Sequence, residues 1–147
     1  MSKTSNLVVS AFCGIFFAAG WWFFIDGVAY ASQKGHPTAG LEIYLPGILA
    51  TFGLFLINNL PNELFSSDAG FWGSEEIEWY HKALVVLSVM LNLASMIMSV
   101  WVYFGKKFHT NPSFEIKWRA QTSIIQSGLI SLASFLWRFG WKKPDTY

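Results

Sequence analysis

The residues that could carry chemistry in this chain are few and widely spaced. Asp26 lies inside the apolar stretch GWWFFIDGVAY (20–30), where a carboxylate could serve a proton or ion relay. The other candidate groups fall in separate parts of the sequence, namely His36, His81, His109 and the single cysteine Cys13. Catalytic and metal sites need several such groups together, and no H-E-x-x-H, C-x-x-C or G-x-S-x-G motif occurs. The sequence therefore predicts no enzyme, no metal site and no cofactor.

The composition indicates that lipid, rather than water, surrounds much of the chain. Hydrophobic residues make up 53% of the 147 residues and aromatic residues 18%, whereas charged residues make up only 13%. Soluble domains carry roughly one quarter charged residues. A soluble protein of this size could not enclose so much apolar surface. We expect an integral membrane protein, and the net charge of +1 gives no reason to expect a nucleic-acid partner.

Four long runs with almost no charge predict an all-α, integral membrane four-helix bundle. A run of 18 residues crosses a hydrocarbon core of about 30 Å as a helix, whose backbone needs no partner from the lipid. The last run contains several serines and glutamines, so three spans with a peripheral fourth helix stay open as an alternative. The predicted spans cover residues 7–30, 43–60, 83–105 and 120–137.

The first run also resembles a secretory signal peptide, because Ala29-Tyr30-Ala31 matches a cleavage site. Its apolar stretch of about 22 residues exceeds the 7–15 of a signal sequence, so we expect a retained span. Four spans place both ends of the chain on one side of the membrane. The ten lysines and arginines divide equally between the two sides, so the positive-inside rule ties. Lys3 and the amino terminus favour cytosolic ends.

Asp26 is expected near one membrane surface rather than at the midplane. It follows Leu7 by a helical distance of about 28 Å, at the level where the second and fourth spans begin. Three roles stay open: a solvated residue, a partner for a helix start or for Lys117 or Arg119, and a relay. We expect it to face other helices, with Trp21 and Trp22 one turn deeper, lining lipid or a partner.

Small and polar residues recur at helical spacing within the spans. Ser123, Ser127 and Ser131 lie four apart in the last run, and Asn92 belongs to a similar stripe in the third. In lipid, small residues permit close packing and polar residues hydrogen-bond across it, so these stripes predict packing seams. A water-lined pathway uses the same residue types. However, no acid, base or histidine lies near the middle of a span, which disfavours a pump.

The segment between the second and third spans contains turn residues followed by acids. Ser74 before Glu75 and Glu76 is typical of a helix start. Nearby aromatic residues suit the membrane interface. The segment is interpreted as an interfacial anchor or, alternatively, as an acidic surface for a partner.

Several motifs resemble the transmembrane protein 50 family, small four-span proteins that include a fungal vacuolar-protein-sorting member. Gly14 followed by GWWFFIDGVAY resembles the first-span signature of that family, and LPGILATFGLFLINNL, with Asn58 and Asn59 at its end, is similar to the second span. SSDAGFWGS resembles a loop of the fungal branch, and GLISLASFLWRFGW resembles the end of the fourth span. The basic tail and the last loop match nothing in this pattern.

The resemblance implies a non-enzymatic function, in which Asp26, Asn58 and Asn59 are family-like positions without an assigned role. For the fungal branch it implies endosome-to-vacuole trafficking with a second small four-span protein of the leptin-receptor-overlapping-transcript type. For the wider family it implies endoplasmic reticulum, Golgi and endosomal membranes. An accessory subunit of a large membrane complex is the alternative function, and a small channel or carrier is a third.

Overall fold

The described part of the chain consists of four long helices. The computed structural model describes residues 2–36, 40–60, 78–109 and 113–140, and no strand occurs within these ranges. This confirms the predicted all-α class and the four-helix bundle. The interpretation of Ser74 as a helix start, and of the segment around it as an anchor or docking surface, lies outside the described residues. The helices are α1 (Ser2–Gln33), α2 (Leu41–Asn58), α4 (Trp79–His109) and α5 (Phe114–Gly140).

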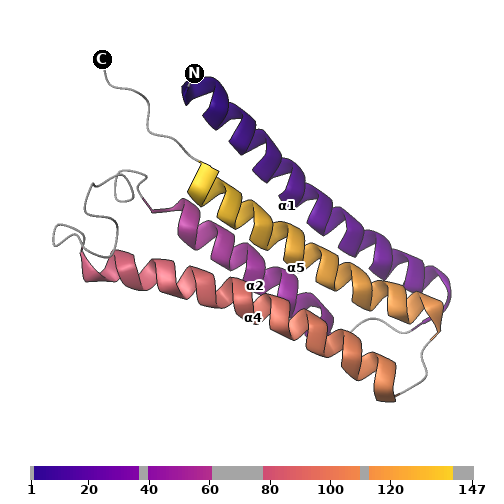
Figure 1. Ribbon diagram of the computed structural model, residues 1–147. Helices are drawn as coiled ribbons and strands as arrows, with labels where there is room; N and C mark the ends of the chain where they lie inside the picture. The colour runs from indigo at the N-terminus through magenta and orange to yellow at the C-terminus, as the bar shows by residue number, and fades with distance from the viewer. Residues whose placement is uncertain (1, 37–39, 61–77, 110–112, 141–147) are drawn as a thin grey trace.

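The helices run alternately up and down, and α5 is the only one that packs extensively against all of the others. In Figure 1, α5 lies between α1 on one side and α2 with α4 on the other. α1 packs chiefly against α5, whereas α2 packs against both α4 and α5. The end of α5 lies beside the start of α1, since a Cβ at Gly140 would come within 3.0 Å of Val9. Both ends of the helical chain therefore lie at one end of the bundle.

The last helix differs from the others in composition. By length and apolar character, three helices of the described chain qualify to cross a membrane, namely Lys3–Gln33, Leu41–Asn58 and Trp79–Gly105. α5 has 27 residues, or about 40 Å of helix, so its length also suffices. It does not qualify because its central turns are rich in serine, threonine and glutamine, and these polar side chains are buried inside the bundle. The central position of α5 accounts for its polar composition. The neighbouring helices cover its polar side chains, which lipid would otherwise contact.

Glycines allow α1 to approach α5 closely. A Cβ added to Gly27 would collide with the side chain of Thr122, and one added to Gly20 would lie 3.2 Å from the backbone oxygen of Gln126. These two glycines lie seven residues apart, which places them on the same face of α1. Because apolar burial does not drive association in lipid, such close contacts supply much of the packing energy.

Serine hydroxyls of α4 bind backbone carbonyls of α2. Ser88 donates to the carbonyl of Gly53 at 2.7 Å, and Ser95 donates to that of Pro46 at 2.6 Å. Pro46 lies inside α2 and has no N–H to donate in the helical ladder, while its own carbonyl accepts the bond from Ser95. The contact of α2 with α4 is therefore both close and hydrogen-bonded.

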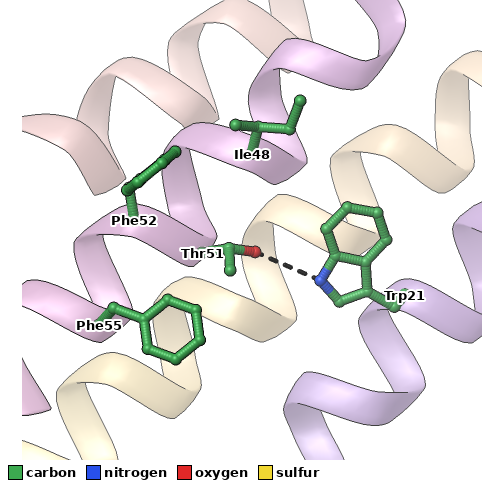
Figure 2. A pocket seen from close by; sticks show the side chains of 5 residues that line it. All are labelled: Trp21, Ile48, Thr51, Phe52 and Phe55. Carbon is green, nitrogen blue, oxygen red and sulfur yellow. Dashed lines mark hydrogen bonds between the residues drawn. The ribbon is translucent and has the colours of Figure 1, made fainter.

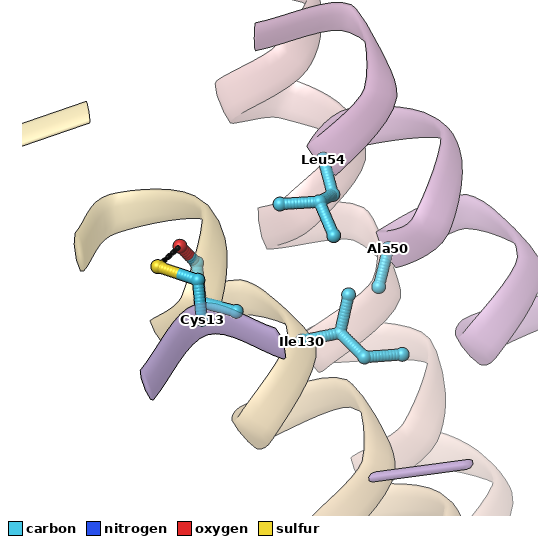
Figure 3. Packing of buried hydrophobic residues seen from close by; sticks show 5 residues of the cluster. Cys13, Ala50, Leu54 and Ile130 are labelled. Atoms are coloured by element: carbon cyan, nitrogen blue, oxygen red, sulfur yellow. Dashed lines mark hydrogen bonds between the residues drawn. The ribbon is translucent and has the colours of Figure 1, made fainter. Parts of the chain in front are cut away.

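A small apolar cluster joins α1, α2 and α5 at the level of Cys13. Figure 3 shows Cys13 beside Ala50, Leu54 and Ile130. The thiol of Cys13 is buried and its Sγ lies 3.3 Å from the carbonyl oxygen of Ala133, to which it donates. Here Cys13 acts as a small packing residue.

At the opposite end, the connection after α1 contacts the start of α5. The Nε2 atom of His36 lies 3.1 Å from the hydroxyl of Ser113 and 3.6 Å from Glu115 Oε2. The pKa of the Glu115 carboxyl is below its ordinary value, first because its own backbone N–H donates to it and then because Ser113 does. Because folding lowers this pKa, the carboxylate stabilises the fold at pH values above the ordinary pKa of about 4.3. That stabilisation is lost as the pH falls through the lowered pKa of the folded state. The Glu115 carboxyl is therefore ionised at neutral pH.

The close approach at Gly27 predicts a position-specific penalty for a single methyl group. Gly27→Ala should lower the free energy of unfolding by about 1–3 kcal/mol, because Thr122 must move. Thr122→Ala in the same chain should restore part of this loss. The measurement is thermal unfolding of detergent-purified protein.

Gly128→Ala is the matched control, since nothing lies within 4 Å of a Cβ there. It should be neutral or stabilising by up to about 1 kcal/mol, the helix-propensity gain of alanine over glycine. Equal effects at Gly27 and Gly128 would mean that α1 does not approach α5 as closely as described.

Candidate functional site

The first feature of interest is a buried row of amide and hydroxyl side chains, here called the polar seam. It runs along the faces of α4 and α5 that point into the bundle. Every member is less than a tenth exposed, so protein encloses the whole row. The members are Ser88, Asn92, Ser95, Ser99, Thr122, Ser123, Gln126, Ser127, Ser131 and Ser134.

The four seam residues singled out in the sequence are all buried, but they differ in their partners. Ser123 Oγ lies 3.4 Å from the carbonyl oxygen of Ile43 on α2, and Asn92 donates to the carbonyl of Ser88 at 2.9 Å. The hydroxyls of Ser127 and Ser131, and the Oδ1 atom of Asn92, have no hydrogen-bond partner among the described residues. The stripe therefore joins helices partly by hydrogen bonds and partly by the close packing of small side chains.

Gln126 is one of the seam residues that the sequence patterns did not single out. Its side chain is 0% exposed, and neither its Oε1 nor its Nε2 has a partner among the described residues. The side chain packs directly on Gly47 of α2, where a Cβ would collide with it, and its backbone packs on Gly20 of α1. Gln126 thus marks the level at which three helices meet. The sequence did contain a signal for this residue, namely a glutamine inside a run of residues otherwise suited to the membrane.

The chemistry of the polar seam is that of neutral donors and acceptors. Its members are serines, one threonine and two amides, none of which takes up or releases a proton near neutral pH. Such groups hold helices together across a lipid-like interior. Among the described residues, no three histidine, cysteine or acidic side chains come together to hold a metal ion.

The two adjacent tryptophans of α1 have different environments. Trp21 faces α2, where its indole N–H lies 3.3 Å from the hydroxyl of Thr51. Trp22 points away from the bundle and is 74% exposed. Successive residues on a helix lie about 100° apart, so only one of the two can face a given neighbour. Trp21 is therefore a packing residue, and Trp22 is available to lipid or to a partner.

Asp26 lies one turn beyond Trp22 and is exposed on the outside of the bundle. The indole N–H of Trp118, in the second turn of α5, lies 3.5 Å from its Oδ2 atom. This is a long hydrogen bond and therefore a weak one. Asp26 thus contacts the start of α5 through Trp118. Its role, and its pairing with Lys117 or Arg119, stay predictions.

The two asparagines at the end of α2 have separate roles. Asn59 caps the helix, since its side-chain amide donates to the carbonyl of Phe55 at 2.9 Å and its backbone N–H to the same oxygen at 3.1 Å. The helix therefore ends at Asn58, two residues before the predicted end of that span. Asn58 is exposed and lies at the edge of a hollow between α1 and α2.

A helical bundle with apolar outer faces and a polar interior seam defines this chain as a small polytopic membrane protein. It belongs to the uncharacterised protein family UPF0220, whose model matches residues 1–147. The chain is also similar to the transmembrane protein 50 homolog of Dictyostelium discoideum, with 27% identity across 99% of this chain and 96% of that protein. These matches confirm the resemblance to the transmembrane protein 50 family. No solved structure matches the chain.

Enclosure of the serine stripe predicts that larger side chains will not be tolerated there. Replacing Ser123, Ser127 and Ser131 together with leucine should reduce the amount of folded protein strongly, since each change overpacks a buried site at about 1–3 kcal/mol. The measurement is the monodisperse fraction in size-exclusion chromatography, compared at equal expression.

A matched triple variant separates enclosure from a general effect of added leucines. Ala11, Ala29 and Ala94 are exposed, so changing all three to leucine should leave the folded fraction near that of wild type. Normal folding of the serine triple variant would show that the stripe faces lipid.

Proposed function

We propose that this chain is a non-enzymatic membrane protein that acts in endosomal, vacuolar or secretory-pathway trafficking by binding other small membrane proteins. The observation that carries the proposal is the outer face of α1, on which Trp22 and Asp26 lie one turn apart and exposed. The bundle covers only one side of α1, chiefly with α5. A long membrane helix held on one side is well placed to receive a second protein on the other.

The chemistry of this face suits a protein partner better than lipid alone. Within the hydrocarbon, a carboxylate costs about 2.5–3.5 kcal/mol at the centre of a span and less toward the surface, so a polar partner would stabilise Asp26. Exposed tryptophan is among the residue types that contribute most to protein interfaces. Together the two side chains provide one apolar anchor and one hydrogen-bond acceptor at neighbouring positions.

The family supports this assignment. For the fungal branch, the resemblance to transmembrane protein 50 implies endosome-to-vacuole trafficking with a partner of the leptin-receptor-overlapping-transcript type. For the wider family it implies endoplasmic reticulum, Golgi and endosomal membranes. The polar seam supports a binding role over a pump because it consists of neutral amides and hydroxyls. An accessory subunit of a large membrane complex would use the same face of α1.

Photocrosslinking in native membranes tests the proposal. A photoreactive amino acid at position 22 should capture a discrete membrane protein, and Asp26→Asn should reduce that capture about tenfold, or about 1.4 kcal/mol of binding. Asp26→Asn should leave the folded fraction unchanged, because the bond to Trp118 is long and exposed.

Ile97, which is 70% exposed on α4, is the matched control position for the photoreactive residue. Capture of the same proteins from positions 22 and 97 would contradict a specific face on α1. A small captured partner, with missorting of vacuolar cargo in Asp26→Asn cells, supports the trafficking role. Purification as a stable part of a large complex would instead favour the accessory subunit, and ion flux in liposomes would favour a channel.

A further inference from the structure

A groove runs along the outside of the bundle between α1 and α2, because both helices pack on α5 more than on each other. It consists of two hollows that share Phe55 as a wall. The inner hollow, lined by Trp21, Thr51 and Phe52 among others, has a volume of about 140 Å³. The outer hollow, which extends from Gly14 to Asn58, has a volume of about 270 Å³. These two hollows together are called the α1–α2 groove.

The inner hollow offers no free hydrogen-bonding group to an occupant. Its two polar side-chain groups bind each other, as the dashed line between Trp21 and Thr51 in Figure 2 shows. The indole nitrogen of Trp21 donates to Thr51 Oγ1 at 3.3 Å. The Thr51 hydroxyl in turn donates to the carbonyl of Gly47 at 2.8 Å. The remaining lining is aromatic and aliphatic. An occupant of this part must therefore be apolar.

The outer hollow has the opposite character at its end. Ser10 of α1 and the exposed carboxamide of Asn58 lie there, at the terminus of α2 and thus toward the membrane surface. From Asn58 to Ile48 the groove extends about 15 Å along the helix axis, half of the hydrocarbon thickness. The groove is thus polar near one membrane surface and apolar toward the middle, which is the polarity of one lipid molecule in one leaflet.

The volume of the inner hollow suits an acyl chain. An apolar cavity of about 150 Å³ takes a molecule of six carbons, so the inner hollow fits a short stretch of hydrocarbon chain. Unfilled, these walls would lose the dispersion contacts of their aromatic rings.

We propose that the α1–α2 groove binds one glycerophospholipid, with an acyl chain passing Phe55 into the inner hollow and the glycerol esters beside Ser10 and Asn58. Gly14 lines the outer hollow, and a Cβ there would meet nothing within 4 Å. A larger side chain at Gly14 would fill the space of the chain without disturbing a helix contact.

The test uses full-length protein in phosphatidylcholine liposomes that contain phosphatidylcholine with a diazirine on its acyl chain. After illumination, mass spectrometry should find label on Phe52 and Phe55 at least about fivefold above that on Leu93 and Ile97. This ratio corresponds to about 1 kcal/mol of preference over bulk lipid. Leu93 and Ile97 are exposed on the outer face of α4 and report ordinary lipid contact.

Gly14→Leu should reduce the label on Phe52 and Phe55 to the level of Ile97. Gly105→Leu, on α4, is the matched control and should leave it unchanged, since a Cβ at Gly105 also meets nothing within 4 Å. If Gly14→Leu fails to fold, Phe55→Ala removes the shared wall and should lower the label on Phe52 about fivefold, again about 1 kcal/mol. Equal labelling of groove and α4 face in wild type would overturn the proposal. The proposal would also be overturned if a protein helix, detected by cross-linking, covered the groove and prevented its labelling by lipid.

Discussion

Enclosure of the polar side of α5 is the constraint on which the rest of this fold depends. Hydrocarbon offers no hydrogen bonds, so amides and hydroxyls at that depth must face protein. α5 carries Thr122, Ser123, Gln126 and Ser127 on consecutive turns, all fully buried. One neighbouring helix could not cover so wide a polar surface. Three helices pack against α5 and together enclose its polar side, whereas Leu132 and Phe135 on the same helix stay partly exposed.

The same arrangement leaves α1 covered on one side only. Close contact of α1 with α5 requires Gly20 and Gly27, which allow the two backbones to approach. With α1 and α2 both packed on α5, a groove stays open between them, and the outer face of α1 presents Trp22 and Asp26. The α1–α2 groove and the exposed outer face of α1 are therefore both consequences of placing the polar helix at the centre.

The sequence predicted the helices and the serine stripe, because uncharged runs and four-residue spacing are local signals. It could not distinguish Trp21 from Trp22, since their environments depend on the rotation of α1 about its axis. It did not single out Gln126, because enclosure by Gly20 and Gly47 brings together three distant segments. It left open whether Asp26 is solvated, pairs with a helix start or a cation, or serves a relay, because the neighbour it meets, Trp118, depends on the rotation of two helices at once.

We propose that α5 crosses the membrane although its composition alone does not qualify it. The most direct measurement is protease protection of epitope tags placed at the two ends of the chain in sealed native vesicles. If α5 spans the membrane, both tags are on the same side, and both are cleaved or both protected before detergent is added. Cleavage of one tag with protection of the other would mean three spans and a peripheral α5, which would contradict the account.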